Sequence, residues 1–396
     1  MLNIFLKVTT VILLSLTVTA CAGTAFSDLF SNYNKQMQGV KNAQQRGNFE
    51  QALALIPERS ENNGSYGLSL LEKARLEFLA SDYKKSQRDF ALVYQQVQQA
   101  EQAAKIQLSR GIENVTAIVS NDNATRYDIP YYEQSMLHCY QALNYLNQND
   151  LSGALVEIRR ANLVQKKALQ ANQKILFDAQ DSMAKKGISP ESLASKYPAM
   201  NTAIGEVKNG FQNAYTFYLS GLLYEAAGQA NDAYIDYKKA LEIYPHNVTV
   251  QQDVWRLANK LAMSNDIQLF SKRFASDITQ TTHPKNSTQN KSRQRGQLVV
   301  LVEQGIIPSK QEVSINLPIF TSRNDMRFYS VALPSYQNRL GQYSGLSLSY
   351  QGKTYQSNEI VRLQSLAAKQ LQDEMPVIVS RQIVRLVAKE EIRQQM

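Results

Sequence analysis

The sequence predicts a mainly α-helical protein, in which a solenoid of helical hairpins is followed by a small α+β domain. Three observations support this prediction. Small residues recur 34 or 68 residues apart in the first part of the chain, as they do where stacked helical hairpins cross. Between 276 and 296 the composition changes to Ser, Thr, Gln and Asn. After 297 apolar and polar residues alternate, which is the period of strands.

Residues 1–20 have the pattern of a secretory signal peptide. Lys7 precedes an apolar run from Val8 to Val18, which is too short to span a membrane. The run ends in Val-Thr-Ala before Cys21, and small residues before a cysteine resemble the bacterial lipobox. That resemblance implies cleavage before Cys21 and acylation of its thiol, with chains such as palmitate. An ordinary signal peptide with a cysteine near its cleavage site is the alternative.

Ala22 stands where an aspartate would signal retention in the inner membrane of a Gram-negative bacterium. With alanine at this position the sequence resembles the sorting pattern of outer-membrane lipoproteins. A lipid anchor with more than one acyl chain is stable. We therefore expect the protein to be lipid-anchored through Cys21 at the periplasmic face of the outer membrane.

The composition fits a soluble body on this anchor. Lysines and arginines number 43 against 34 acids, which gives a formal net charge of +9. Such a charge suits anionic envelope surfaces or solubility. Nucleic acid is not an expected partner, because the chain is exported and has no nucleic-acid motif. With Cys21 acylated, Cys139 has no partner for a disulfide, and the position of Cys139 in an apolar helix indicates a buried thiol.

Residues 214–247 contain the clearest repeat. The segment AYTFYLSGLLYEAAGQANDAYIDYKKALEIYP resembles a tetratricopeptide repeat (TPR). Gly221 and Ala233 are small where two antiparallel helices cross, and Pro245 ends the second helix. The positions that match the repeat are Phe217, Gly221, Tyr224, Ala233, Tyr237, Ala240 and Pro245.

The marker position of Ala233 recurs at Ala52, Ser86 and Ala154, with gaps of 34 and 68 residues between these three. A TPR unit has about 34 residues, so both gaps are whole repeats. The longer gap before Ala233 indicates an insertion. We expect a TPR-like solenoid over residues 21–272.

The stretch NDNATRYDIPYYE, from Asn121 to Glu133, interrupts this pattern where a repeat is due, and Pro130 is expected at the first position of the next helix. Long loops inside compact domains are often functional. A calcium loop is not indicated, because the stretch has no glycine and few acids. A connector is one reading and a partner contact is the other, through Asn121, Asp122, Asn123, Tyr127 and Glu133.

The concave face of a solenoid is the second candidate surface for a partner. The TPR pattern places Tyr215, Tyr218 and Glu225 on this face, and tyrosines suit the recognition of a peptide or protein. The alternative is that these tyrosines pack against the next helix. Arg159 and Arg160 are expected to hold the 121–133 loop or to form a basic helix surface.

Residues 273–296 are predicted to be a polar, basic linker, and residues 297–396 a small α+β domain. Residues 297–305 are a short apolar run that ends at Gly305. Strands are expected in EVSINLPIF and in RFYSVALP, and a hairpin around Gln351 and Gly352, so that a mixed sheet with one or two helices results. Helical spacing follows. In the tail, Arg381, Arg385, Lys389 and Arg393 follow one face, which is typical of a helix on a membrane surface or of one packed on its own domain.

No catalytic motif is present. The three histidines, His138, His246 and His283, are scattered, and neither a zinc motif nor a nucleophile elbow or phosphate loop occurs. His138 and Cys139 are adjacent on a helix and therefore point apart. We expect no enzyme activity, no metal and no cofactor.

Between Asn121 and Asn162 the chain contains the segments NDN, YDIPYYE, ALNYL and EIRRAN. Further on it contains LVVLVEQGIIPSKQEVSINLPIF, followed by VALPSY. Together these segments resemble an uncharacterised family of bacterial TPR lipoproteins. What is known of the family implies an outer-membrane adaptor or regulator in cell-envelope biogenesis, near lipoproteins that activate peptidoglycan synthesis. It also implies a segment beyond the position matching Met396. The alternatives are a peptidoglycan-associated binding protein and an enzyme with an unrecognised site in the second domain.

Overall fold

The computed structural model describes residues 33–109, 127–274, 297–320 and 326–395, apart from positions 186, 190, 191 and 194. Several predictions lie outside these residues: the signal peptide and the lipidation of Cys21, the contacts of Asn121, Asp122 and Asn123, and most of the linker.

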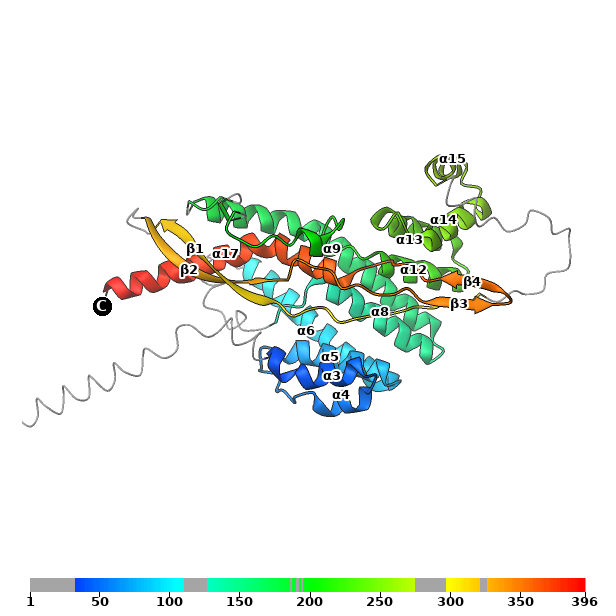
Figure 1. The fold of residues 1–396 in the computed structure, drawn as a ribbon, viewed down its shortest axis with the longest axis horizontal. Coiled ribbons are helices and arrows are strands. Elements are labelled where there is room, and N and C mark those ends of the chain that lie inside the picture. Colours follow the sequence, from blue (N-terminus) through cyan, green and yellow to red (C-terminus); the bar gives the residue numbers. More distant parts are fainter. Residues whose placement is uncertain are drawn as a thin grey trace, which may run out of the picture.

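Antiparallel helical hairpins form the larger part of the described chain, as a TPR-like solenoid requires (Figure 1). The fold is mainly α, as predicted. In order, α3 (Gln38–Gln45) pairs with α4 (Phe49–Leu55), α5 (Tyr66–Leu79) with α6 (Tyr83–Ser109), α8 (Tyr131–Asn147) with α9 (Leu151–Ala184), α12 (Ala214–Ala226) with α13 (Ala230–Ile243), and α14 (Val248–Lys260) with α15 (Ser264–Arg273).

The hairpin turns share one backbone device. In each, one residue after the first helix has a positive φ between 53° and 76°, which reverses the chain, and these residues are Gly47, Ser81, Asn149, Gly228 and Ala262. Side-chain caps then start several helices: Asn48 accepts from the amide of Gln51, and Asp150 from that of Gly153.

The helix crossing predicted for the clearest repeat is present between α12 and α13. A Cβ atom added at Gly221 would lie 2.4 Å from the ring of Tyr237, so only glycine permits this approach. Ala233, Tyr237 and Ala240 are fully buried. Ala52, Ser86 and Ala154, the markers of the other hairpins, are also fully buried, which confirms the phase of the repeat.

Helix α8 begins at Tyr131. Pro130 is its N-cap, so the proline lies one position before the first helical position, where it was predicted. The α5–α6 hairpin packs directly on α8. The insertion expected before the clearest repeat, from Leu169 to Asn201, begins as the extended helix that was predicted, because α9 continues to Ala184. After it, the described positions up to 213 are irregular apart from a helical turn at Ser192 and Leu193 and the short helix α11 (Asn201–Ile204).

The C-terminal region contains two antiparallel strand pairs and one helix. Strand β1 (Gln311–Phe320) pairs with β2 (Met326–Ser335), and β3 (Ser347–Tyr350) pairs with β4 (Lys353–Gln356). Gln351 and Gly352 both have a positive φ, which is typical of a two-residue hairpin turn. These strands confirm three predicted segments. Helix α17 (Leu363–Gln395) joins the predicted helix and tail across Pro376.

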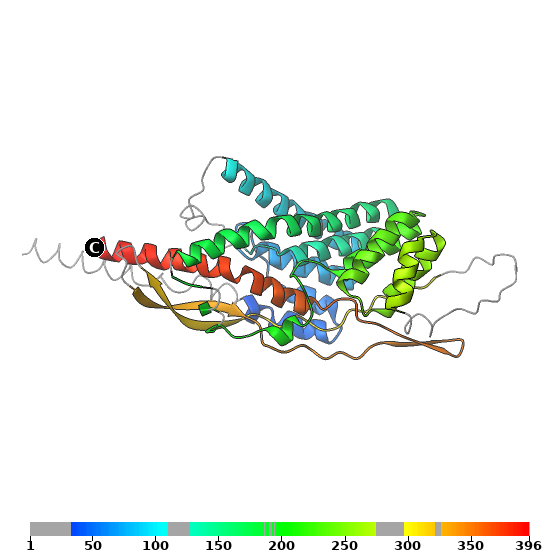
Figure 2. The same cartoon turned by 90° about the horizontal axis from the view of Figure 1, so that it is seen from above.

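One expectation for this region was wrong, and it concerns how the strands assemble. The apolar run at 297–305 forms no strand and pairs with none in the described chain. The described residues form no mixed sheet: the two strand pairs lie at opposite ends of the molecule (Figures 1 and 2), so they do not join into one sheet.

One apolar core connects the C-terminal region to the solenoid. It combines Leu317 of β1, Leu333 of β2 and Leu371 of α17 with Met183 of α9 and Ile204 of α11. In both views α17 runs beside α9 (Figures 1 and 2). The tail helix therefore packs on the protein itself, and Val379 and Ile383 are buried there. In the described part of the chain, no helix has both the length and the apolar content to cross a bilayer.

Candidate functional site

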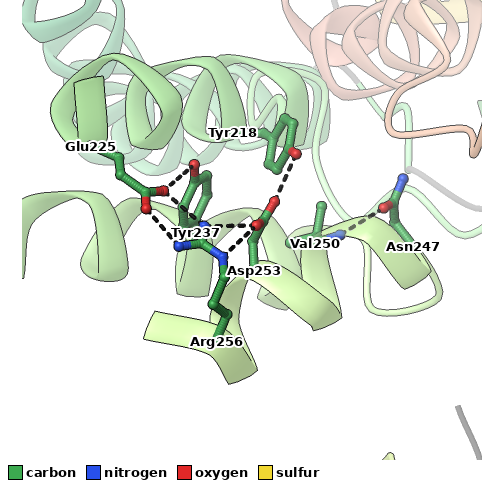
Figure 3. A network of polar contacts seen from close by, with 7 residues as sticks. All are labelled: Tyr218, Glu225, Tyr237, Asn247, Val250, Asp253 and Arg256. Carbon is green, nitrogen blue, oxygen red and sulfur yellow. Dashed lines mark hydrogen bonds and ion pairs between the residues drawn. The ribbon is translucent and has the colours of Figure 1, made fainter. Parts of the chain in front are cut away.

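The residues predicted to face a groove in the clearest repeat contact neighbouring helices of the solenoid. Tyr215 and Tyr218 are buried, whereas the ion pair of Glu225 is partly exposed. Figure 3 shows the contacts of Tyr218 and Glu225. The hydroxyl of Tyr218 donates to Asp253 of α14 at 2.8 Å. Glu225 accepts from the guanidinium of Arg256, also on α14, at 2.5 and 2.8 Å. Tyr215 is buried, 8% exposed, in the core between α8 and α12.

These positions correspond to the alternative in which the tyrosines pack on neighbouring helices. Burial and the Asp253 carboxylate raise the pKa of Tyr218, so its hydroxyl stays protonated and keeps donating. The Arg256 guanidinium lowers the pKa of Glu225, which stays charged. A direct contact of these residues with a partner remains a prediction, and Tyr215 and Tyr218 have little free surface for it.

At the end of the interrupting stretch, Tyr127 and Glu133 are tied to each other. The amide of Tyr127 donates to the carbonyl of Gly64 at 2.7 Å, and its hydroxyl donates to Glu133 at 2.8 Å. The hydroxyl of Tyr132 donates to the same carboxylate oxygen at 3.0 Å. This end of the stretch is therefore fixed against the loop that precedes α5, and Glu133 is not held by Arg159 or Arg160.

Glu133 lies in a polar region that is poorly solvated. Burial raises the pKa of Glu133 to about 7, although the two phenols and Lys310 oppose the shift. Burial also raises the pKa of Glu72 on α5 and lowers that of Lys310. The region, formed by α5, α8 and the start of β1, can take up or release a proton near neutral pH.

A carboxylate contact that the sequence did not predict joins the solenoid to the C-terminal region. Glu303, in the irregular segment 297–310, accepts from the Tyr140 hydroxyl at 2.8 Å and from Nη2 of Arg75 at 3.0 Å. Nε of Arg75 donates to the same hydroxyl at 3.0 Å. The ring of Tyr140 stacks on Phe90 with centroids 5.7 Å apart, so the hydroxyl is rigidly placed.

A second irregular segment binds further along the solenoid. Asn247 donates from its amide to the carbonyl of Glu359 at 2.8 Å, and the Tyr244 hydroxyl donates to the Glu359 carboxylate at 2.6 Å. Ile360 then packs against two neighbouring cores of the solenoid, one built mainly from α5 to α9 and one from α12 to α15. The helices thus hold irregular polypeptide at two places, through side-chain carboxylates, a backbone carbonyl and an apolar anchor.

Sequence reasoning missed these contacts because their partners are far apart in the chain. Glu303 is separated from Tyr140 by 163 residues and from Arg75 by 228. The available signal was the abundance of tyrosine in the first helices of the hairpins. It led to the prediction of Tyr215 and Tyr218 rather than of Tyr140.

His138 and Cys139 do not act together. Nδ1 of His138 lies 2.7 Å from Glu157, whereas the Cys139 thiol donates to Thr216 at 3.4 Å. Burial raises the pKa of Cys139 to about 12, so the thiol is not nucleophilic at neutral pH, as expected for a core thiol. The described residues contain no group of three or more metal-ligating side chains.

No family model matches the chain, and no curated protein matches it. Solved structures that resemble it include MamA from Desulfovibrio magneticus RS-1, with 14% identity, a TM-score of 0.31, and coverage of 64% of this chain and 94% of MamA. TPR-like repeats of a kinesin light chain from Podosopora anserina give 13% identity, a TM-score of 0.35, and coverage of 63% and 96%. A thermophilic TPR protein of Thermus thermophilus gives 12% identity, a TM-score of 0.27, and coverage of 62% of this chain and 99% of that protein. No function is drawn from likenesses at this level.

Proposed function

We propose that this protein is a non-catalytic adaptor of the cell envelope, in which the solenoid binds an extended segment of a partner protein. The observation that carries this proposal is that the helices already hold irregular polypeptide of the same chain through specific contacts. Glu303 on Arg75 and Tyr140, and Glu359 on Tyr244, use the polar groups and aromatic hydroxyls that suit peptide recognition.

The exposed sides of successive hairpins offer a place to test for a partner without disturbing the fold. Leu163 on α9, Ile235 on α13 and Leu269 on α15 are each at least half exposed. A photo-crosslinker at each position in living cells, in the chain with Cys21 intact, is expected to capture one envelope protein from two or more neighbouring positions. Capture from none of them would contradict the adaptor proposal. The same crosslinker at Phe328 on β2, which is 68% exposed and off the solenoid, is the control.

The lipid anchor is part of the proposal and rests on the sequence before Cys21. We expect Cys21→Ser to abolish labelling by palmitate and to move the protein from the outer-membrane fraction to the soluble periplasm, because the variant has no thiol to acylate. Cys139→Ser is the matched control and should keep the label, since that thiol is buried inside the solenoid. A Cys21→Ser protein that stays labelled and membrane-bound would contradict the anchor.

A further inference from the structure

A basic pocket of about 350 Å³ lies between α6, α8 and α9. Three cationic side chains line it: Lys84 and Arg88 from α6, and Arg160 from α9. Glu157 is its only lining acid among the described residues. The pocket is separate from the contact of Glu303 with Arg75 and Tyr140, because none of those three residues lines it.

The one acid is already ion-paired with Arg160 and also contacts His138. Glu157 is 3% exposed and accepts from Nη1 of Arg160 at 2.6 Å, and its second oxygen lies 2.7 Å from Nδ1 of His138. Arg88 uses Nε for Asp89, which lies outside the pocket, at 2.7 Å. A guanidinium has five N–H donors, so Arg88 and Arg160 both keep donors for a ligand. The exposed ammonium of Lys84 adds a third positive group.

The inner wall of the pocket, formed by Gln141, Tyr94 and Arg160, is held in place. Gln141, 4% exposed, donates to the backbone carbonyl of Gln87 at 3.0 Å. The Arg160 guanidinium lies over the ring of Tyr94 at 5.1 Å, and that ring meets His138 edge-on at 4.7 Å. Because the arginine is held by an aromatic ring and by Glu157, little side-chain entropy is lost when it binds a ligand.

We infer that this pocket binds a carboxylate of an acidic peptide segment, with the adjoining apolar side chain against Tyr94 and Tyr145. A carboxylate matches the planar fork of a guanidinium and takes two donors at once. A volume of about 350 Å³ accommodates one or two side chains rather than a long polyanion. The inference goes beyond the adaptor proposal, since the pocket binds its ligand whether or not the chain is anchored or holds a partner elsewhere.

The test uses the mature protein and an array of fluorescent hexapeptides, each with one central glutamate and varied apolar neighbours, beside the same peptides with glutamine. Fluorescence anisotropy should show some glutamate peptides binding at least about tenfold more tightly than their glutamine versions, as charge-assisted hydrogen bonds imply. The Lys84→Gln/Arg88→Gln double variant should lose about tenfold in affinity. Lys85→Gln is the control, because Lys85 is exposed, pairs with Asp82 and does not line the pocket.

Three results would overturn the inference. In one, no glutamate peptide binds, or none binds better than its glutamine version. In another, the double variant binds as tightly as the wild type, which would place the site elsewhere. In the third, the protein sediments with purified peptidoglycan through Lys84 and Arg88 while the peptides fail to bind, which would make the ligand a cell-wall polymer. In-cell capture at Leu163, Ile235 and Leu269 is measured in a separate experiment, so a failure of the adaptor proposal can be distinguished from a failure of the pocket inference.

Discussion

Glu133 shows how strongly a single residue is governed by its surroundings. It stands in the first turn of α8, where a carboxylate is normally favourable. Yet burial raises its pKa to about 7, because two phenolic hydroxyls and Lys310 replace only part of the lost water. The sequence placed Glu133 beside the interrupting loop, but it gave no sign of this burial, which depends on residues around 72 and 310.

We expect stability to fall as the pH rises from about 5 to about 7. The folded state raises the pKa of Glu133 above its ordinary value of 4.5, so it binds the proton more tightly than the unfolded chain, and its contribution is lost above the folded pKa. The loss is at most about 3 kcal/mol. Glu133→Gln should reduce the difference in unfolding free energy between pH 5 and pH 8, measured in urea.

Glu72, whose pKa burial also raises, should leave a smaller slope of the same sign in that variant. Glu58→Gln serves as the control, because Glu58 is exposed, and it should keep the wild-type slope. An unchanged slope in Glu133→Gln would show that other groups cause the pH dependence.

Gly221 is the residue whose role was most readily predicted from sequence. An added methyl group would lie 2.4 Å from the Tyr237 ring, so Gly221→Ala should destabilise the protein by about 1–3 kcal/mol. Gly39→Ala is the matched control: its nearest neighbour would be Leu55 at 3.6 Å, and helix propensity should make it neutral or stabilising by up to about 1 kcal/mol. Equal urea midpoints for the two variants would contradict the close crossing of α12 and α13.

At the scale of elements, periodicity predicted the hairpins and the strands β1 to β4 because each depends on local pattern. It assigned no element to the apolar run at 297–305, which forms neither helix nor strand. It left the orientation of Tyr215 and Tyr218 open between a groove and a neighbouring helix, because the exposed face of α12 is decided by α8 and α14, which contact it from elsewhere in the chain. Pattern therefore gives the elements, and packing decides which of their faces remain free.

The segment 297–310 should be loosened by a single change. Glu303→Gln removes the charge that Arg75 and Tyr140 hold, at a cost of about 1 kcal/mol for a partly exposed pair. A fluorophore on Leu298→Cys, a position that is 85% exposed, should then rotate more freely and give lower anisotropy. Glu312→Gln, an exposed acid on β1, should leave the anisotropy unchanged. If Glu303→Gln also leaves it unchanged, this contact does not fix the segment.

At the scale of the whole molecule, the C-terminal region and the solenoid are joined by shared side chains. Val361 packs against both the C-terminal core and the core around α8, and Ile360 packs against the core around α8 and the core of α12 to α15. The sequence predicted a change of structure near 297, but it carried no sign that the two parts share a core. Cores built from distant segments have no local pattern to reveal them.

Shared cores predict one unfolding transition. Leu333→Ala should cost about 2–5 kcal/mol, because Leu333 is 1% exposed in the core of β1, β2 and α17. Fluorescence of Trp255, the single tryptophan, which lies on the solenoid helix α14, should shift to lower urea together with the far-UV circular dichroism. Leu348→Ala on the exposed β3 should change stability by less than about 0.5 kcal/mol. A Trp255 transition that does not move would show that the two parts unfold separately.

The length of helix α9 has a consequence for folding during synthesis. Its first turns pack with α8, which is made just before it, whereas Met183 near its end packs with β1, β2 and α17. Synthesis proceeds from the N-terminus, so α11 follows the end of α9 at once, but more than a hundred further residues must be made before β1, β2 and α17 appear. Until then the apolar side chains at this end of α9 are open to aggregation or to chaperones. The packing of the end of α9, in the middle of the chain, is therefore completed only after the C-terminal strands and helix have been synthesised.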